Sequence, residues 1–169
     1  MNVKFFLGAN SGEGFYSLYD DFAHSDGDFL YLIKGGPGCG KSSFMKKIGS
    51  RAEALGYDVE YILCSGDPES LDGVYIPALK VGFADATAPH IIEPELFGYN
   101  SCYVNLGKFC SRADNEAIAE YSKLYKQMYT SAYKYLGAAA DIKKVHIPQL
   151  FGGKELNIAG KRAQSALRR

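Results

Sequence analysis

The residues best suited to chemistry are a glycine-rich run that ends in a lysine and two serines. Gly35 is followed, after four residues, by Gly40-Lys41-Ser42, which satisfies the G-x-x-x-x-G-K-[ST] phosphate-loop pattern. Lys41 can place its ammonium group on the β- and γ-phosphates of a nucleotide, and Ser42 can supply a hydroxyl to Mg²⁺. We therefore predict binding of ATP or GTP with Mg²⁺. The predicted binding residues are Gly35, Gly36, Pro37, Gly38, Cys39, Gly40, Lys41, Ser42 and Ser43.

A second group of candidates follows the loop in the sequence. Residues 79–85 form an apolar run that ends in Asp85, and an aspartate at a strand tip can orient Mg²⁺ together with Ser42. Lys41 and Asp85 are thus the principal catalytic candidates, and Ser42 and Asp85 the predicted metal ligands. Ala86 takes the place of the glutamate that activates water in many ATPases. The absence of a glutamate at this position argues against vigorous hydrolysis by the chain alone.

Weaker candidates lie in polar stretches beside the two strands. Asp67 and Asp72 fall in a turn-rich segment, residues 65–73, and could hold Mg²⁺, position water or bind an acceptor; ordinary loop solvation, with Asp67 capping a turn, is an equal alternative. Thr87 could sense a γ-phosphate. His90 could exchange a proton near neutral pH, although a local structural role is more common for a single histidine. Glu93 and Glu95 are weaker candidates for a base.

The elements that must position these residues alternate between strand and helix. Residues 28–33 read as a buried parallel strand and residues 43–55 as a helix with Phe44, Ile48 and Leu55 on one face. Residues 58–64 and 79–85 read as further strands. This order predicts an α/β fold, similar to a phosphate-loop NTPase, with three α/β/α layers and a mainly parallel sheet. Only these three segments have a convincing strand pattern, whereas a phosphate-loop domain usually has five strands. We therefore expect an incomplete sheet.

Two other segments show helical spacing. Apolar residues in 15–22 suggest a short amphipathic helix, whose aromatic rings pack in the core or stack on a base. A longer pattern begins near an N-cap at Ser111 and reaches Lys144, with tyrosines at every fourth position from Tyr121 to Tyr133. Core packing is the favoured use of these tyrosines and a partner interface the alternative. Residues 146–153 read as a linker-like break, so we predict a phosphate-loop domain over 1–145 and a basic linker with a short helix over 146–169.

Composition describes a globular protein with an uneven distribution of charge. The 169 residues are 47% hydrophobic and 22% charged, and no apolar run suits a membrane span or a secretory signal, so a cytoplasmic protein is expected. Residues 142–169 hold seven Lys/Arg against one Glu, a charge of +6. This basic end could contact nucleic acid or an acidic partner, but a solvated helix is favoured.

The four cysteines show no metal-type spacing such as C-x-x-C, and free buried thiols are favoured over a disulfide framework. Cys39 lies among the predicted phosphate donors, where a thiol could be open to modification. A filler role is favoured because Cys39 occupies a variable position of the motif.

The motifs together resemble a poorly characterised bacterial family of ATPases built from two tandem phosphate-loop halves. The pieces that carry the resemblance are residues 12–15, 34–42, 67–74, 85–90 and 104–107, in the family's order, with Ala86 where the family usually has glycine. The resemblance implies nucleotide binding, ATP hydrolysis and a second half of similar size. The chain ends at Arg169, about where that half would begin. We therefore expect either a fragment or a short relative that assembles with another subunit, such as a second copy of itself.

Three functions remain open. The favoured one is a Mg²⁺-dependent ATPase or GTPase module. A small-molecule or nucleotide kinase would use the Asp67–Asp72 stretch to bind an acceptor, but no arginine-rich lid supports it. A nucleotide-dependent interaction module would bind without efficient turnover and signal through the long helix. Arg51 and Arg112 are the only arginines before the basic end, so charge stabilisation in trans by another subunit is plausible.

Overall fold

A computed structural model of the chain describes residues 2–23, 26–87, 92–94, 98–110 and 115–166, without the side chains of residues 21, 115–118 and 147–166. The chain divides into two compact units, which we describe separately. The first comprises Met1–Asn10 and Phe15–Asn115, and the second comprises Ser11–Gly14 and Glu116–Arg169.

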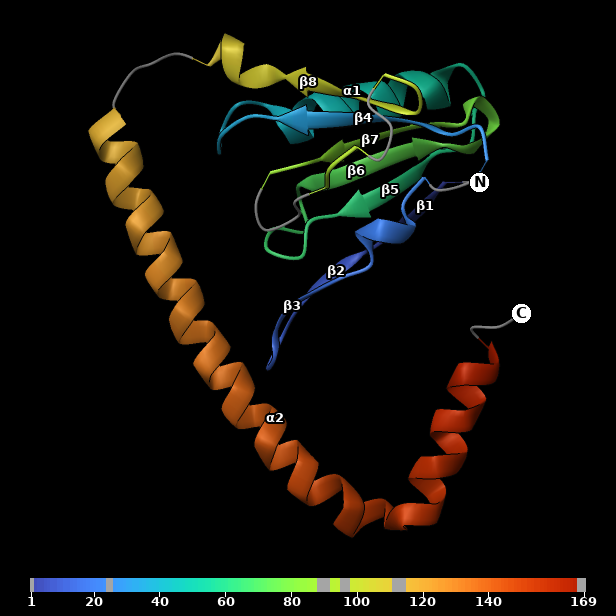
Figure 1. Cartoon of the computed structure of the whole chain (residues 1–169), viewed down its shortest axis with the longest axis vertical. Helices are drawn as coiled ribbons and strands as arrows, with labels where there is room; N and C mark the ends of the chain where they lie inside the picture. The colour runs from blue at the N-terminus through green and yellow to red at the C-terminus, as the bar shows by residue number, and fades with distance from the viewer. Residues whose placement is uncertain (1, 24–25, 88–91, 95–97, 111–114, 167–169) are drawn as a thin grey trace. The chain divides into compact units, whose positions relative to one another are not determined.

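The first unit is built on a six-stranded mixed sheet with the order β1-β5-β6-β7-β4-β8 (Figure 1). All neighbouring pairs are parallel except those that β6 makes with β5 and β7, so the sheet is mainly parallel, as predicted. The strands are β1 (Val3–Phe5), β4 (Phe29–Lys34), β5 (Glu60–Leu63), β6 (Leu71–Ile76), β7 (Val81–Asp85) and β8 (Ser101–Asn105).

The expectation of an incomplete, three-stranded sheet is wrong. The predicted strands correspond to β4, β5 and β7, whereas β1, β6 and β8 were not assigned. These three have little apolar periodicity of their own: β1 is three residues long, and β6 contains Asp72 and Gly73. Their backbone hydrogen bonds to stronger neighbours define them, and that information is not local in sequence.

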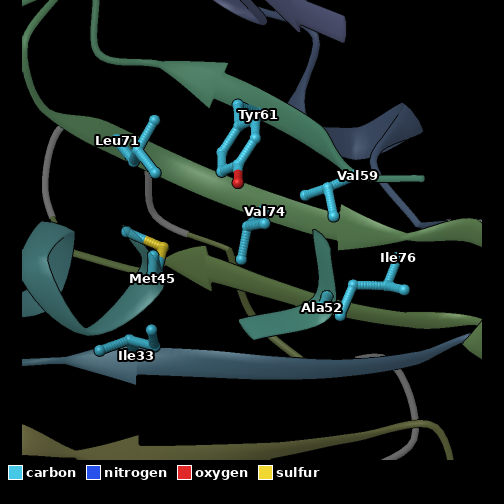
Figure 2. Close-up of a cluster of buried hydrophobic side chains, with 8 residues drawn as sticks. All are labelled: Ile33, Met45, Ala52, Val59, Tyr61, Leu71, Val74 and Ile76. Carbon is cyan, nitrogen blue, oxygen red and sulfur yellow. The ribbon is translucent and has the colours of Figure 1, made fainter. Parts of the chain in front are cut away.

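One face of the sheet is covered by helix α1 (Lys41–Ala54). Met45 and Ala52 point from the helix toward Ile33, Val74 and the other buried side chains in Figure 2. Leu55, predicted for the buried face, lies beyond the helix end and is 60% exposed. Met45 and Gly49 take the interior positions instead, one residue out of phase with the predicted Phe44 and Ile48, which are partly buried.

The opposite face is covered by an extended segment rather than by the predicted helix over 15–22. That segment consists of β3 (Gly14–Ser17) and the short 3₁₀ helix η1 (Tyr19–Asp21), and β3 pairs with β2 (Gly8–Ser11). The Leu18 N–H donates to the Leu7 carbonyl at 2.7 Å, so the backbone bonds to a neighbouring segment rather than within a helix. Tyr19 and Phe22 are buried with Leu32 and Ala84, which confirms the core role of these aromatic rings. The described part of this unit therefore lacks the second helical layer of the predicted α/β/α arrangement.

The second unit contains the long C-terminal helix that the sequence predicts. Helix α2 (Asn115–Ala166) continues through residues 146–153, so the predicted break there is wrong. Pro148 removes one backbone hydrogen bond without ending the helix, which is the local cost that proline imposes in a helix interior. The predicted cap at residues 111–114 lies outside the described residues.

The tip of the β2–β3 hairpin, Ser11–Gly14, packs on this helix. A Cβ on Gly12 would lie 2.8 Å from the Ala140 Cβ and 2.9 Å from the Leu136 carbonyl oxygen. Within this unit Tyr121 and Tyr125 are 72% and 58% exposed, which contradicts the favoured core role for these two, whereas Tyr129 and Tyr133 are half-buried. Over the described residues, neither α1 nor α2 has the length and apolarity of a bilayer span.

Candidate phosphate-binding site

The glycine-rich loop connects the end of β4 to the start of α1, as the motif requires. Gly38 and Gly40 have φ angles of 76° and 80°, in the left-handed region that favours glycine. Gly40 is the N-cap of α1, and the Phe44 N–H makes a helical bond to its carbonyl at 2.9 Å. The N–H groups that come before Phe44 in the first helical turn therefore have no acceptor within the helix. Such N–H groups at the start of a helix attract anions.

The start of the loop passes very close to the 3₁₀ helix η3 (Leu106–Phe109). A Cβ on Gly35 would lie 3.2 Å from the Cys39 Cβ and 3.4 Å from the Gly107 nitrogen. A side chain at Gly35 would therefore be in tight contact with Cys39 and would touch η3. The first glycine of the motif thus lies at a close approach of the two segments.

Lys41 lies inside the loop and is largely shielded from solvent. Its Nζ donates to the carbonyl oxygens of Gly35, at 2.7 Å, and Gly36, at 3.1 Å. The same nitrogen is 3.5 Å from Asp85 Oδ2, and the Lys41 and Asp85 side chains are 12% and 14% exposed. The structure thus brings together the two residues that the sequence identified as principal catalytic candidates.

Asp85 reaches this position because β7 is the direct neighbour of β4. Asp85 is opposite Ile33 in the parallel register, so both strands end at the loop. The Thr87 N–H donates to Asp85 Oδ1 at 2.9 Å, and the Thr87 hydroxyl donates to the same oxygen. Thr87, predicted as a phosphate sensor, therefore holds the carboxylate in place. Ala86 is 1% exposed and packs in the core.

Ser42 connects the loop to β6. Its Oγ accepts a hydrogen bond from the Leu71 N–H at 2.9 Å, at the first residue of β6. The described residues contain no group of three or more His, Cys, Asp or Glu that could together hold a metal ion. Mg²⁺ in nucleotide sites is commonly held by one or two protein oxygens together with phosphates and water. The hydroxyl of Ser42, which follows Lys41 in the sequence, and the carboxylate of Asp85, 3.5 Å from the Lys41 Nζ, are hard oxygen donors that fit that requirement.

The two other carboxylates in the predicted site occupy different environments. Asp67 accepts from the Glu69 N–H at 3.2 Å and from the Ser70 hydroxyl at 2.6 Å, so it caps its own turn, as the alternative interpretation expected. Asp72 is not a loop residue: it lies in β6 and is 5% exposed. Tyr19 donates its hydroxyl to Asp72 Oδ2 at 3.1 Å. Burial and the adjacent carboxylate raise the pKa of Tyr19 far above its usual range.

The contact of Tyr19 with Asp72 was not predicted. The sequence offered only the aromatic character of Tyr19, since 53 residues separate the two side chains.

The remaining candidates for a base lie beside the β4 end or outside the described residues. Tyr103 donates to Glu93, and that hydrogen bond, with the Lys34 ammonium 3.6 Å away, lowers the pKa of Glu93. Glu93 is thus held as a paired carboxylate. His90 and Glu95 lie outside the described residues.

The prediction of free thiols is wrong for two of the four cysteines. Cys39 in the loop and Cys110 after η3 form a disulfide, with a Cα–Cα distance of 5.5 Å across 71 residues. Cys64 and Cys102 are free. The pairing depends on the close passage of Gly35 past η3, which no local pattern in the sequence encodes.

Comparisons with known proteins do not assign the chain to a family. No protein-family model, no curated protein and no solved structure matches this chain.

Proposed function

We propose that the chain is a Mg²⁺-dependent module that binds ATP or GTP and hydrolyses it slowly. The observation that supports the proposal best is the 3.5 Å contact between Lys41 Nζ and Asp85, at the end of a glycine loop that opens a helix. An ammonium group, the N–H groups of a helix start and a strand-end carboxylate then meet at one edge of the sheet. This combination suits a triphosphate and its metal.

The chemical roles follow from the positions of the side chains. Backbone N–H groups of Gly38–Ser43 would bind phosphate oxygens. Lys41 would exchange its bonds to the Gly35 and Gly36 carbonyls for bonds to the phosphates and so stabilise the charge that develops on the transferred phosphoryl group. Ser42 and Asp85 would hold Mg²⁺, which neutralises phosphate charge when bound. Thr87 keeps the Asp85 carboxylate oriented.

We expect slow turnover because the residue after Asp85 has no side chain that can act as a base. The following residue is the buried Ala86, which cannot activate water. Among the described candidates, Glu93 is paired with Tyr103 and Lys34. Efficient hydrolysis would require a residue from another subunit or segment. A second phosphate-loop half of the tandem ATPase family, which the motifs resemble, or a second copy of the chain would be such a source.

The kinase alternative is weaker because the carboxylates that would bind the phosphate-accepting substrate already have hydrogen-bond partners within the protein. Asp67 caps a turn, and Asp72 accepts a hydrogen bond from Tyr19. An interaction module that binds nucleotide without turnover would use the same loop, and the buried Ala86 is compatible with it. Phosphate release distinguishes these three functions.

The primary test is isothermal titration of the full chain with ATP and with GTP, in the presence and absence of Mg²⁺. Replacing Lys41 with alanine removes a charged hydrogen-bond donor, so we expect affinity to fall by about tenfold to hundredfold. Lys47→Ala is the matched control, because Lys47 is an exposed lysine on the same helix. Titration under reducing conditions that detects no binding by the folded wild-type chain would refute the proposal.

Phosphate release should then be measured with and without candidate acceptors. Slow release that needs no acceptor, and that Asp85→Asn reduces, supports a hydrolase. Transfer that occurs only with an acceptor supports the kinase, and tight binding without release supports the interaction module.

A further inference from the structure

The Cys39–Cys110 disulfide joins the candidate phosphate loop to a neighbouring element at one point. Cys110 follows η3, where its N–H bonds to the Gly107 carbonyl at 3.4 Å. Gly107 is also the residue against which Gly35 packs. The disulfide therefore ties the middle of the loop to the element that already supports its first residue.

The tethered loop is closed on itself. The Cys39 N–H donates to the Gly36 carbonyl at 3.3 Å, which directs this amide into the loop. Lys41 Nζ donates to the Gly35 and Gly36 carbonyls. A triphosphate would need both donors, because backbone N–H groups and the motif lysine are the groups that bind phosphate oxygens in such loops. Opening the loop requires Cys39 to move relative to η3, and the disulfide opposes that movement.

We propose that Cys39 and Cys110 form a redox switch that weakens nucleotide binding when oxidised and restores it when reduced. The inference rests on the proposed nucleotide binding and adds its regulation. In the reduced state Cys39 is free to turn its N–H toward a phosphate, whereas in the oxidised state the loop stays closed.

The chemistry requires a small-molecule disulfide, such as glutathione disulfide, as the oxidant. The thiolate of one cysteine attacks the small disulfide, forms a mixed disulfide and releases one small thiol. The thiolate of the other cysteine then attacks the protein sulfur of the mixed disulfide and releases the second small thiol. The protein loses two electrons and two protons overall, and one small disulfide becomes two thiols. An excess of dithiol reverses the reaction.

The test is titration of ATP with Mg²⁺ into the full chain after treatment with glutathione disulfide and again after reduction with dithiothreitol. Intact-mass and peptide analysis show which cysteines are bonded. We expect affinity to fall by about tenfold to hundredfold on oxidation, the equivalent of one charged hydrogen bond, and to recover on reduction. Cys110→Ser cannot resolve a mixed disulfide on Cys39, so its oxidised sample is limited to protein whose intact mass shows no bound glutathione, and that protein should bind with the reduced affinity under both conditions. Cys102→Ser, which removes a free thiol, should behave like the wild type.

The outcomes separate this inference from the proposed function. Equal affinity of the oxidised and reduced wild type, or failure of glutathione disulfide to form the Cys39–Cys110 bond, refutes the switch while nucleotide binding stands. No binding by reduced wild type and by Cys110→Ser refutes the proposed function and the switch together.

Discussion

At the scale of single residues, the candidate site consists of side chains that restrain one another. Thr87 orients Asp85, and Asp85 lies 3.5 Å from Lys41. Ser42 accepts from the first N–H of β6. Tyr19 supports the buried carboxylate of Asp72. Apart from the local bond between Thr87 and Asp85, these contacts join residues that are distant in sequence, and together they limit the motion of the side chains.

Two tyrosines outside the site should make stability sensitive to alkaline pH. Tyr61 donates to Glu53 at 2.8 Å and Tyr75 donates to Asp28 at 2.8 Å; burial, followed by these hydrogen bonds, raises the pKa of each tyrosine to about 12. Because the folded pKa exceeds the unfolded value of about 10, the stabilisation is fully present below pH 10 and is lost between about pH 10 and pH 12. We expect the free energy of unfolding to fall across that window.

Urea unfolding at about pH 8 and about pH 11 measures this effect. Tyr61→Phe and Tyr75→Phe should each reduce the difference between the two pH values, and Tyr16→Phe, at a tyrosine that is 63% exposed, should not. An unchanged pH dependence in both the Tyr61 and the Tyr75 variants would show that these hydroxyl groups do not carry the effect.

At the scale of elements, the site depends on how closely α1 can approach the sheet. Gly49 lies on the buried face of α1, and a Cβ there would come within 2.4 Å of the Tyr61 ring. The Tyr61 hydroxyl bonds to Glu53 on the same helix, which limits the movement of the ring. The absence of a side chain at Gly49 thus sets the distance between α1 and β5.

Gly49→Ala should destabilise the protein although alanine favours helix formation. The propensity gain of about 1 kcal/mol is smaller than the strain of overpacking, about 1–3 kcal/mol. We therefore expect unfolding to become easier by up to about 2 kcal/mol, measured by chemical denaturation. Lys47→Ala, on the exposed side of the same helix, should leave stability nearly unchanged. An increase in stability with Gly49→Ala would mean that Tyr61 moves aside without cost.

At the scale of the whole molecule, the chain forms two units, and a short segment of the second unit lies within the sequence of the first. The four-residue hairpin tip Ser11–Gly14 belongs with α2, while the strands that lead to and from it are assigned to the other unit. Within the second unit, small residues allow the contact, since Gly12 lies against Gly137 and Ala140. Glu13 adds an exposed ion pair with Lys144 at 3.6 Å.

Gly12→Ala should detach the hairpin tip from α2. The added Cβ would lie 2.8 Å from the Ala140 Cβ and 2.9 Å from a backbone oxygen, and neither atom can rotate away. We expect amide hydrogen exchange at residues 11–14 to accelerate, as measured by mass spectrometry. Glu13→Gln is the control, because an exposed ion pair contributes little. Equal exchange in Gly12→Ala and the wild type would mean that the tip does not rest on α2 in solution.

Several features could be predicted from the sequence because their causes are local. The order of strand, glycine loop and helix follows from apolar periodicity and from the motif around Lys41. The long helix after residue 115 follows from its repeating apolar positions. The position of Asp85 near Ser42 and the loop was also expected, because strand ends on one side of a parallel sheet meet at the same edge; its contact with Lys41 was not predicted.

Other features depend on contacts between distant segments. Tyr19 and its neighbours have helical spacing, yet backbone bonding to Leu7 makes the segment extended. Asp72 reads as a loop residue, and pairing with β5 and β7 places it in a strand. Cys39 and Cys110 lie 71 residues apart and meet because Gly35 allows the loop to touch η3. The sequence alone identified the loop that we propose to bind phosphate. Tertiary structure decided that Asp85, Leu71 and Cys110 lie against this loop, because those contacts form only when distant segments meet around one sheet.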